Sequence, residues 1–271
     1  MTFGRGESAS SDWLDIVRPN QVVSLTTMQI VIGAQLGFAL LLWWLSPWAV
    51  LPKPNEVFSA LGRLWMEEGL GPELFTSFWM NVQALLITAV ISLGLAYLSV
   101  LPAVRPIVAA VAKGRFLGLS GLTFIFTLIV GGGRPLKLSL LVFGMTVFFV
   151  TSMASVVTSI PKSAFDHART LRMTEWQVVW DVVILGTMDQ AIEVFRQNAA
   201  IGWMMLTMVE GISRSEGGIG AMLLNQNKHF HLAEVFAIQI LILFVGLVQD
   251  YGIGIFKKLV CPWANLTLER Q

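Results

Sequence analysis

Long apolar stretches, separated by short polar segments, run through most of the chain between residues 27 and 256. A helix needs about 20 residues to cross the hydrocarbon core of a bilayer. Five stretches are apolar enough to do so, at residues 28–50, 79–101, 116–130, 138–159 and 235–256. A sixth, at residues 191–209, is polar in its first half and apolar in its second. The pattern therefore predicts about six membrane-spanning segments.

These segments are expected to be α-helices, because lipid offers no hydrogen-bond partner to a backbone amide or carbonyl. The predicted fold is all-α: a polytopic membrane protein with about six transmembrane helices. We divide it into an N-terminal segment at residues 1–26, a transmembrane domain at residues 27–259 and a C-terminal tail at residues 260–271. The start of the chain is polar and lacks the apolar core of a signal peptide, so we expect it to stay on the mature protein.

A charged loop at residues 160–187 interrupts the apolar pattern. Ser163 followed by Asp166, and Thr174 followed by Gln177, have the spacing of capping boxes at helix N-termini. The loop therefore predicts two short amphipathic helices, which either offer a docking surface or form an ordinary surface loop. Each half carries an apolar stripe at helical spacing: Ala164, Ala168 and Leu171 in the first, and Trp176, Val179 and Val183 in the second.

Composition and charge agree with a membrane protein. Hydrophobic residues make up 55% of the chain and charged residues 13%, against about 25% charged in soluble domains. A net charge of +1, with no basic–aromatic stripe, gives no indication of nucleic acid. With a cytoplasmic N-terminus, about twice as many of the 18 basic residues fall on the inside as on the outside. Both termini and the loop at residues 160–187 are thus predicted to be cytoplasmic.

The sequence offers no catalytic set, and we expect no metal site and no cofactor. HExxH and nucleophile-elbow motifs are absent, and Cys261 is the only cysteine. His229 and His231 form an HxH pair, but a metal site needs more ligands. No segment reads GxxxxGK[ST], and the glycine-rich residues 131–137 have the wrong spacing. This chain is therefore not expected to be an enzyme, and any ATP hydrolysis that drives it must occur on a separate subunit.

Polar residues inside membrane spans are costly and often functional. Arg196 and Asn198 can instead face water at the end of a span, Glu210 can belong to a gate or merely cap its span, and Trp203 can serve packing. With these alternatives open, the candidates for a pathway or gate are Asn81, Gln83, Arg196, Asn198, Trp203 and Glu210.

Several motifs, taken in order, resemble one family. Residues 166–172, D-H-A-R-T-L-R, resemble the E-A-A-x-x-x-G loop that forms the coupling helix of ABC importers, and residues 51–57 resemble an L-P-x-P-x-x-V motif after the first span. Arg196, Trp203, Glu210 and residues 217–220 resemble an R…W…E…GLG pattern, and residues 262–263 resemble the family's ending. Over residues 45–263 the chain resembles the permease subunit of a binding-protein-dependent ABC importer of the nitrate/sulfonate/taurine/bicarbonate group.

The chain departs from this family pattern in the coupling loop. Asp166, His167 and Arg172 stand where the family usually has Glu, Ala and Gly. Gly is usual at the last position because the chain turns there between two helices, and Gly enters a left-handed turn at low cost. Gly186 replaces a usual Pro, and the proline-rich third span of many relatives is absent from residues 116–130.

The resemblance implies a protein of the bacterial inner membrane that moves its substrate by alternating access. The implied partners are cytoplasmic ABC ATPase subunits, a second permease chain in a homodimer or heterodimer, and an extracytoplasmic binding protein. The implied substrate is a small anion such as nitrate, sulfonate, taurine or bicarbonate. The alternative is a non-transporting membrane scaffold or tether for an ATPase. The ATPase-docking residues implied are Ala164, Asp166, His167, Ala168, Arg169, Leu171 and Arg172.

Overall fold

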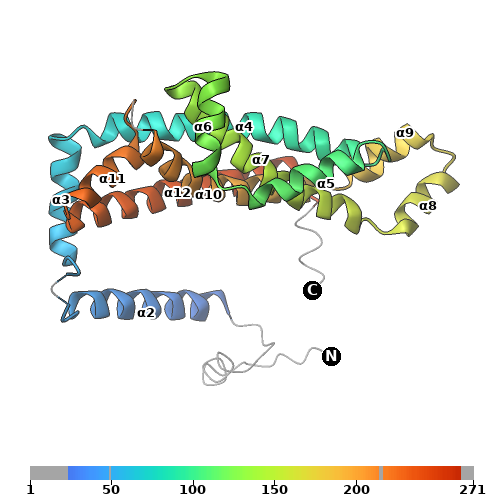
Figure 1. The fold of residues 1–271 in the computed structure, drawn as a ribbon. Coiled ribbons are helices and arrows are strands. Elements are labelled where there is room, and N and C mark those ends of the chain that lie inside the picture. Colours follow the sequence, from blue (N-terminus) through green and yellow to red (C-terminus); the bar gives the residue numbers. More distant parts are fainter. Residues whose placement is uncertain (1–23, 49, 214–215, 264–271) are drawn as a thin grey trace, which may run out of the picture. The chain divides into compact units, whose positions relative to one another are not determined.

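A computed structural model describes residues 24–48, 50–213 and 216–263 (Figure 1). Every regular element in these ranges is a helix, so the all-α prediction is confirmed. The elements are α2 (Leu25–Trp44), α3 (Pro54–Met66), α4 (Leu70–Leu98), α5 (Arg105–Lys113), η1 (Gly114–Phe116), α6 (Leu119–Val130), α7 (Arg134–Ser159), α8 (Lys162–Thr170), α9 (Glu175–Val178), η2 (Val179–Leu185), α10 (Met188–Ile212), α11 (Ile219–Lys228) and α12 (Leu232–Val260).

The chain forms two compact units, residues 1–58 and residues 59–271. In the first unit, the Ser24 hydroxyl accepts a hydrogen bond from the Thr27 amide at 3.3 Å and caps α2. The Trp43 indole N–H donates to the Pro52 carbonyl at 2.9 Å, and the Glu56 carboxylate accepts from the Lys53 amide at 3.0 Å. These contacts fix the end of α2 and the start of α3 through local hydrogen bonds.

The second unit is a helical bundle built around α7. This helix packs against α4 and α10, while α11 and α12 pack against α10. Alanines on α4 let the helix backbones approach closely, as small residues do in membrane bundles. The core cluster consists of Ala89, Ala96, Phe149, Met153, Ala191 and Val194.

Four helices are long and apolar enough to cross a membrane. They are Thr26–Trp44, Leu70–Leu98, Arg134–Ser159 and Leu232–Val260, and they match four of the predicted stretches. A fifth span is present only if Arg105–Phe116 and Leu119–Val130 are counted together, and these are bent by 116°. The described residues therefore hold four or five candidate spans, and the count of about six is not confirmed.

The two remaining predicted stretches differ from the expectation for separate reasons. The stretch at residues 116–130 contains α6, whose 12 residues are fewer than the roughly 20 a straight span needs. The stretch at residues 191–209 is part of one continuous 25-residue helix, α10. It is not among the candidate spans, and its first half holds Glu193 and Arg196, which lower its hydropathy.

The bundle has two distinct ends in Figure 1. Helices α8 and α9 lie at one end of the bundle, and α11 lies at the opposite end. The predicted orientation, with the α8–α9 end in the cytoplasm, stays a prediction. So do the domain boundaries, because residues 1–23 of the N-terminal segment and 264–271 of the tail lie outside the described residues.

The backbones of α11 and α10 pack closely against each other at Gly220. A Cβ atom added at Gly220 would lie 2.5 Å from the Thr207 carbonyl oxygen and 2.7 Å from its Cα. Backbone atoms cannot swing aside as the end of a side chain can. Any side chain at residue 220 must therefore push the two helices apart.

We predict that Gly220→Ala lowers stability by about 1–3 kcal/mol, the usual cost of overpacking. Thermal unfolding of the full chain in mild detergent measures the effect. The matched control is Gly94→Ala in α4, where nothing lies within 4 Å of the added Cβ atom. This control should be neutral or up to about 1 kcal/mol stabilising. Equal midpoints for the two variants would mean that α10 and α11 do not pack this closely.

Candidate functional site

Helix α8 begins directly after Pro161. Pro161 is the N-cap, with φ −67° and ψ 144°, and no side chain caps the helix. The Ala164 amide donates to the Pro161 carbonyl at 3.0 Å. The predicted capping box of Ser163 and Asp166 is therefore wrong. Because the proline ring fixes φ and the chain enters the helix two residues earlier than expected, Ser163 lies inside the first turn.

The end of α8 is a Schellman turn with Arg172 in the left-handed conformation. The Met173 amide donates to the Ala168 carbonyl at 3.4 Å, and the Arg172 amide donates to the Arg169 carbonyl at 2.9 Å. These are the two bonds of that motif, in which the left-handed residue is usually Gly. Arg172 has φ 57°. The turn geometry expected at this position is therefore present, although a non-glycine residue in it costs about 1–2 kcal/mol.

The second short helix is capped as predicted and then widens. The Thr174 hydroxyl accepts from the Gln177 amide, and the Gln177 side chain accepts from the Thr174 amide at 2.8 Å, so this capping box is confirmed. From Val179 to Leu185 the chain is a π-helix, which ends with the Gly186 amide donating to the Asp181 carbonyl at 3.1 Å.

The predicted stripe of Trp176, Val179 and Val183 is confirmed in part: Val183 is buried and Val179 is half-buried, but Trp176 is exposed. The buried pair is Val178 and Val183, while Trp176 is 68% exposed. A π-helix repeats at i, i+5 rather than i, i+4, which moves a different valine inward. No local motif in residues 175–186 indicates this change of repeat.

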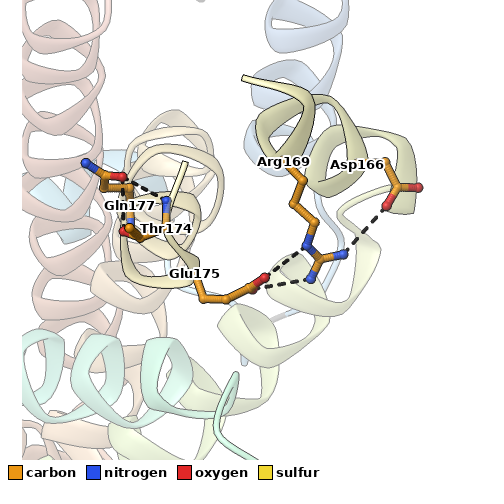
Figure 2. Close-up of polar contacts among 5 residues, drawn as sticks. All are labelled: Asp166, Arg169, Thr174, Glu175 and Gln177. Carbon is orange, nitrogen blue, oxygen red and sulfur yellow. Dashed lines mark hydrogen bonds and ion pairs between the residues drawn. The ribbon is translucent and has the colours of Figure 1, made fainter. Parts of the chain in front are cut away.

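An ion-pair brace joins α8 to α9 (Figure 2). The Arg169 guanidinium donates to both Glu175 carboxylate oxygens, at 3.1 and 3.3 Å, and lies 3.6 Å from the Asp166 carboxylate. The hydrogen bond from Arg169 and its positive charge hold the pKa of Glu175 below the ordinary value. A lowered pKa means that the brace is present above the ordinary pKa of Glu175 and is lost as the pH falls through the folded value.

The seven predicted docking residues fall into two groups. Ala168 is buried and Ala164 half-buried, and both line a cavity of about 470 Å³ between α8, η2 and α10. His167 and Leu171 also line this cavity, but their side chains are exposed. The exposed group, which a partner could reach, is Asp166, His167, Arg169, Leu171 and Arg172.

Two of the predicted pathway residues meet in the bundle interior. The Trp203 indole N–H donates to the Gln249 side-chain oxygen at 2.8 Å, and the Asn81 amide donates to the same oxygen at 3.4 Å. The side-chain oxygens of Asn81 and Asn198 are buried and have no hydrogen-bond partner among the described residues. Sequence reasoning missed Gln249, although an amide side chain in an apolar span was a usable signal.

Two further pathway candidates, Arg196 and Gln83, are bonded to neighbouring side chains. The Arg196 guanidinium lies 2.8 Å from the Glu193 carboxylate and 3.4 Å from that of Asp250, and the Lys257 ammonium lies 3.0 Å from Glu193. Arg196 is thus one of two cations paired with two carboxylates, not an isolated charge. Gln83 accepts a hydrogen bond from Arg134 at 2.9 Å.

Glu210 caps the neighbouring helix α11. Its carboxylate accepts from the Gly220 amide at 2.8 Å and from the Ser77 hydroxyl at 2.6 Å, and Ser77 in turn accepts from the Ile219 amide at 2.9 Å. Glu73 accepts from the Gly218 amide. Three successive amides at a helix N-terminus are thereby satisfied by α4 and α10, and the two carboxylates match the positive end of the helix dipole.

A buried lysine completes this cluster. Lys137 is 1% exposed and donates to the Gly217 carbonyl at 2.8 Å. Gly217 and Gly218 have φ of 69° and 106°, which lets the chain turn sharply before α11. Sequence reasoning missed Glu73, Ser77 and Lys137, because they lie on other helices and only the glycine-rich segment marked the site.

Comparisons with known proteins found two relatives, while no family model matches the chain. The taurine transport system permease protein TauC of Escherichia coli K12 is 21% identical over 248 residues, which cover 84% of this chain and 87% of that protein. An ABC transporter permease protein of Methanocaldococcus jannaschii is 22% identical over 151 residues, covering 56% of this chain and 52% of that protein. Both similarities support an ABC transporter permease. The apolar helices agree with such a permease, which is a multi-pass membrane protein.

We predict that Arg172→Gly stabilises the turn between α8 and α9. Glycine removes a left-handed strain of about 1–2 kcal/mol but loses about 0.5–1 kcal/mol more backbone entropy on folding, so the net gain is up to about 1.5 kcal/mol. Hydrogen–deuterium exchange of peptides from residues 162–178 should slow. Arg172→Ala is the control, because it removes the charge but keeps the strain. Equal slowing in both variants would mean that charge, not backbone strain, sets the local stability.

We also predict that Arg169→Glu speeds hydrogen exchange in α8 and α9, because it places like charges where the brace was. The double variant Arg169→Glu, Glu175→Arg restores an opposite pair and should recover most of the protection. Recovery of protection identifies Arg169 as a positioning residue within the loop. Protection unchanged by the single variant would mean that the brace adds no local stability.

Proposed function

We propose that this permease is the transmembrane subunit of an ATP-driven importer of the nitrate/sulfonate/taurine/bicarbonate group. Its substrate would pass along the interface with a second permease chain as the pathway alternates between the two sides of the membrane. The similarity to TauC supports this proposal because it extends over 87% of that protein, which includes regions outside the coupling loop.

The observation that carries the proposal is the rigid, exposed α8–α9 hairpin at one end of the bundle. A Schellman turn, a capping box and the Arg169–Glu175 brace hold the two helices together without help from a partner. Leu171 is nevertheless 60% exposed at the tip, where an apolar side chain gains from being covered. A preformed helix with an exposed apolar tip is suited to seat in a groove of an ATPase.

Such a docked helix would couple nucleotide state to the pathway. The ATPase must bind nucleotide with different affinity in the two states of the permease, and the docked helix carries that difference in free energy. Because the brace joins α8 to α9, and η2 connects α9 to α10, a push on α8 has a continuous helical path into the bundle. The ion pair between Arg196 and Asp250 continues that path from α10 to α12.

The orientation and partners follow from this role. The α8–α9 end faces the cytoplasm of a bacterium and its ATPase subunits, as the distribution of basic residues predicts. The α11 end faces outward, where an extracytoplasmic binding protein would deliver substrate. Both termini are then cytoplasmic.

The substrate we propose is a small anion such as nitrate, a sulfonate or bicarbonate, or the sulfonate-bearing zwitterion taurine, which is the first to test because TauC is named for taurine transport. Arg196 does not add weight to this choice, since Glu193 and Asp250 already balance its charge. The interior cluster of Asn81, Trp203 and Gln249 offers neutral hydrogen-bonding groups instead.

We predict that Leu171→Glu releases the ATPase. The full chain would be co-expressed with the products of its neighbouring genes, purified through a tag on the permease and reconstituted in liposomes, and the ATPase retained with it would be measured. A charge placed in an apolar contact should lower ATPase retention at least tenfold, or about 1.4 kcal/mol. Leu171 is preferable to Ala168 as a target, because Ala168 is buried in the bundle.

The matched control is Met66→Glu, which replaces an apolar residue that is 87% exposed at the end of α3. It should retain the ATPase and take up taurine like the wild type. Equal ATPase retention by the Leu171 variant would contradict docking through α8. Retention by the wild type without uptake of taurine, nitrate or bicarbonate would favour the scaffold role.

A further inference from the structure

An apolar groove runs along the surface of the bundle where α5 and α6 meet α4 and α7. Its volume is about 660 Å³, and its lining includes Ile91, Leu95, Val111, Leu117, Phe126 and Phe143. The neighbouring surface is apolar as well: Phe116, Leu128 and Ile129 are 72–78% exposed. Exposed apolar patches of this kind mark contact with lipid or with another protein.

Two cations lie at the rim of this groove. Lys113 and Arg115 are exposed and flank Gly114, which lines the groove. No acidic residue occurs in the sequence between Glu73 and Asp166. Among the described residues, no ion pair reaches either cation, and the Arg115 guanidinium lies over the Phe116 ring, 5.1 Å from its centroid. The positive charge at this rim is therefore not balanced within the described part of the chain.

The break between α5 and α6 is an unfavourable place for unbalanced charge in a membrane protein. Each helix is too short to span alone, with 9 and 12 residues, and the pair bends by 116°. A cation beside hydrocarbon is stabilised when its long side chain reaches anionic headgroups at the membrane surface. Basic pockets between membrane helices are known to favour such headgroups.

We propose that this groove binds an anionic phospholipid, with one acyl chain along the apolar lining and the phosphate held by Lys113 and Arg115. The apolar lining requires a ligand with a hydrocarbon part, which a small soluble anion lacks. A second copy of this chain is disfavoured, because a symmetric contact would bring the same unbalanced basic segment against itself. Charge and lining together select a lipid with a negative headgroup.

The test is lipid binding by the purified full chain in mild detergent. Dioleoyl phosphatidylglycerol would be titrated against the thermal unfolding midpoint and compared with dioleoyl phosphatidylcholine, which has the same acyl chains without net charge. The anionic lipid should raise the midpoint further. In the variant Lys113→Gln, Arg115→Gln its apparent affinity should fall about thirty-fold, from about 1 kcal/mol for each basic residue.

Two further variants separate the charged rim from the apolar lining. Lys228→Gln, Lys258→Gln makes the same change in net charge at exposed lysines of α11 and α12 and should leave binding unchanged. Ala110→Trp fills the groove from an exposed position on α5 and should also weaken phosphatidylglycerol binding, with both cations kept. Native mass spectrometry of co-purified lipid gives a second readout that does not depend on the unfolding midpoint.

Three results would overturn the proposal. Equal effects of the two lipids would show that charge is not recognised. Equal stabilisation by inorganic phosphate would identify a soluble oxyanion site without an acyl chain. Loss of a dimer on Ala110→Trp, with no change in bound lipid, would show that a second copy covers the groove.

Discussion

A peptide group inside a bilayer has no water to bind, so each one must find its hydrogen-bond partner within the protein. This constraint accounts for the long helices, and it also explains the polar clusters at their ends. Where α11 begins next to α10, three amides are satisfied by Glu73, Ser77 and Glu210 from two other helices. At the opposite end, the Schellman turn satisfies the last carbonyls of α8 with the chain's own amides. The two ends meet the same requirement with different chemistry.

The difference bears on which parts can move. The α8–α9 hairpin is held by contacts between residues close in sequence, so it can shift as one piece. The start of α11 is held by residues 73 and 77 of α4 and residue 210 of α10, and a relative movement of these two helices must disturb that cap. In an alternating-access cycle, the hairpin would transmit movement and the α11 cap would respond to it.

Features that depend on neighbouring residues could be predicted from the sequence. The Thr174–Gln177 box and four of the apolar spans follow from local patterns, whereas the turn at residue 172 was expected only from the family resemblance. The Ser163 box failed because Pro161 started the helix earlier, which a motif of four residues does not contain. The third stretch failed because apolar composition does not reveal a bend of 116° between two short helices.

Features that depend on packing were beyond the sequence pattern. Arg196 has its partner Asp250 more than 50 residues away, and Glu210 has its partners on α4 and at the start of α11. Their burial and charge balance arise only when the helices assemble. All three residues of the predicted stripe, Ala164, Ala168 and Leu171, line one cavity, yet Ala168 is buried in the bundle and Leu171 is 60% exposed. Periodicity identifies a face of a helix but does not say what covers it.

The π-helix from Val179 to Leu185 affects how positions in this protein correspond to those in relatives. Each turn of a π-helix holds more residues than a turn of an α-helix, so the chain falls behind in rotation as it passes through. A relative with an ordinary α-helix there would reach α10 in the same orientation with fewer residues. Aligning the two chains without a gap would then assign residues on one side of η2 to the wrong helical face, which lowers the identity computed between them.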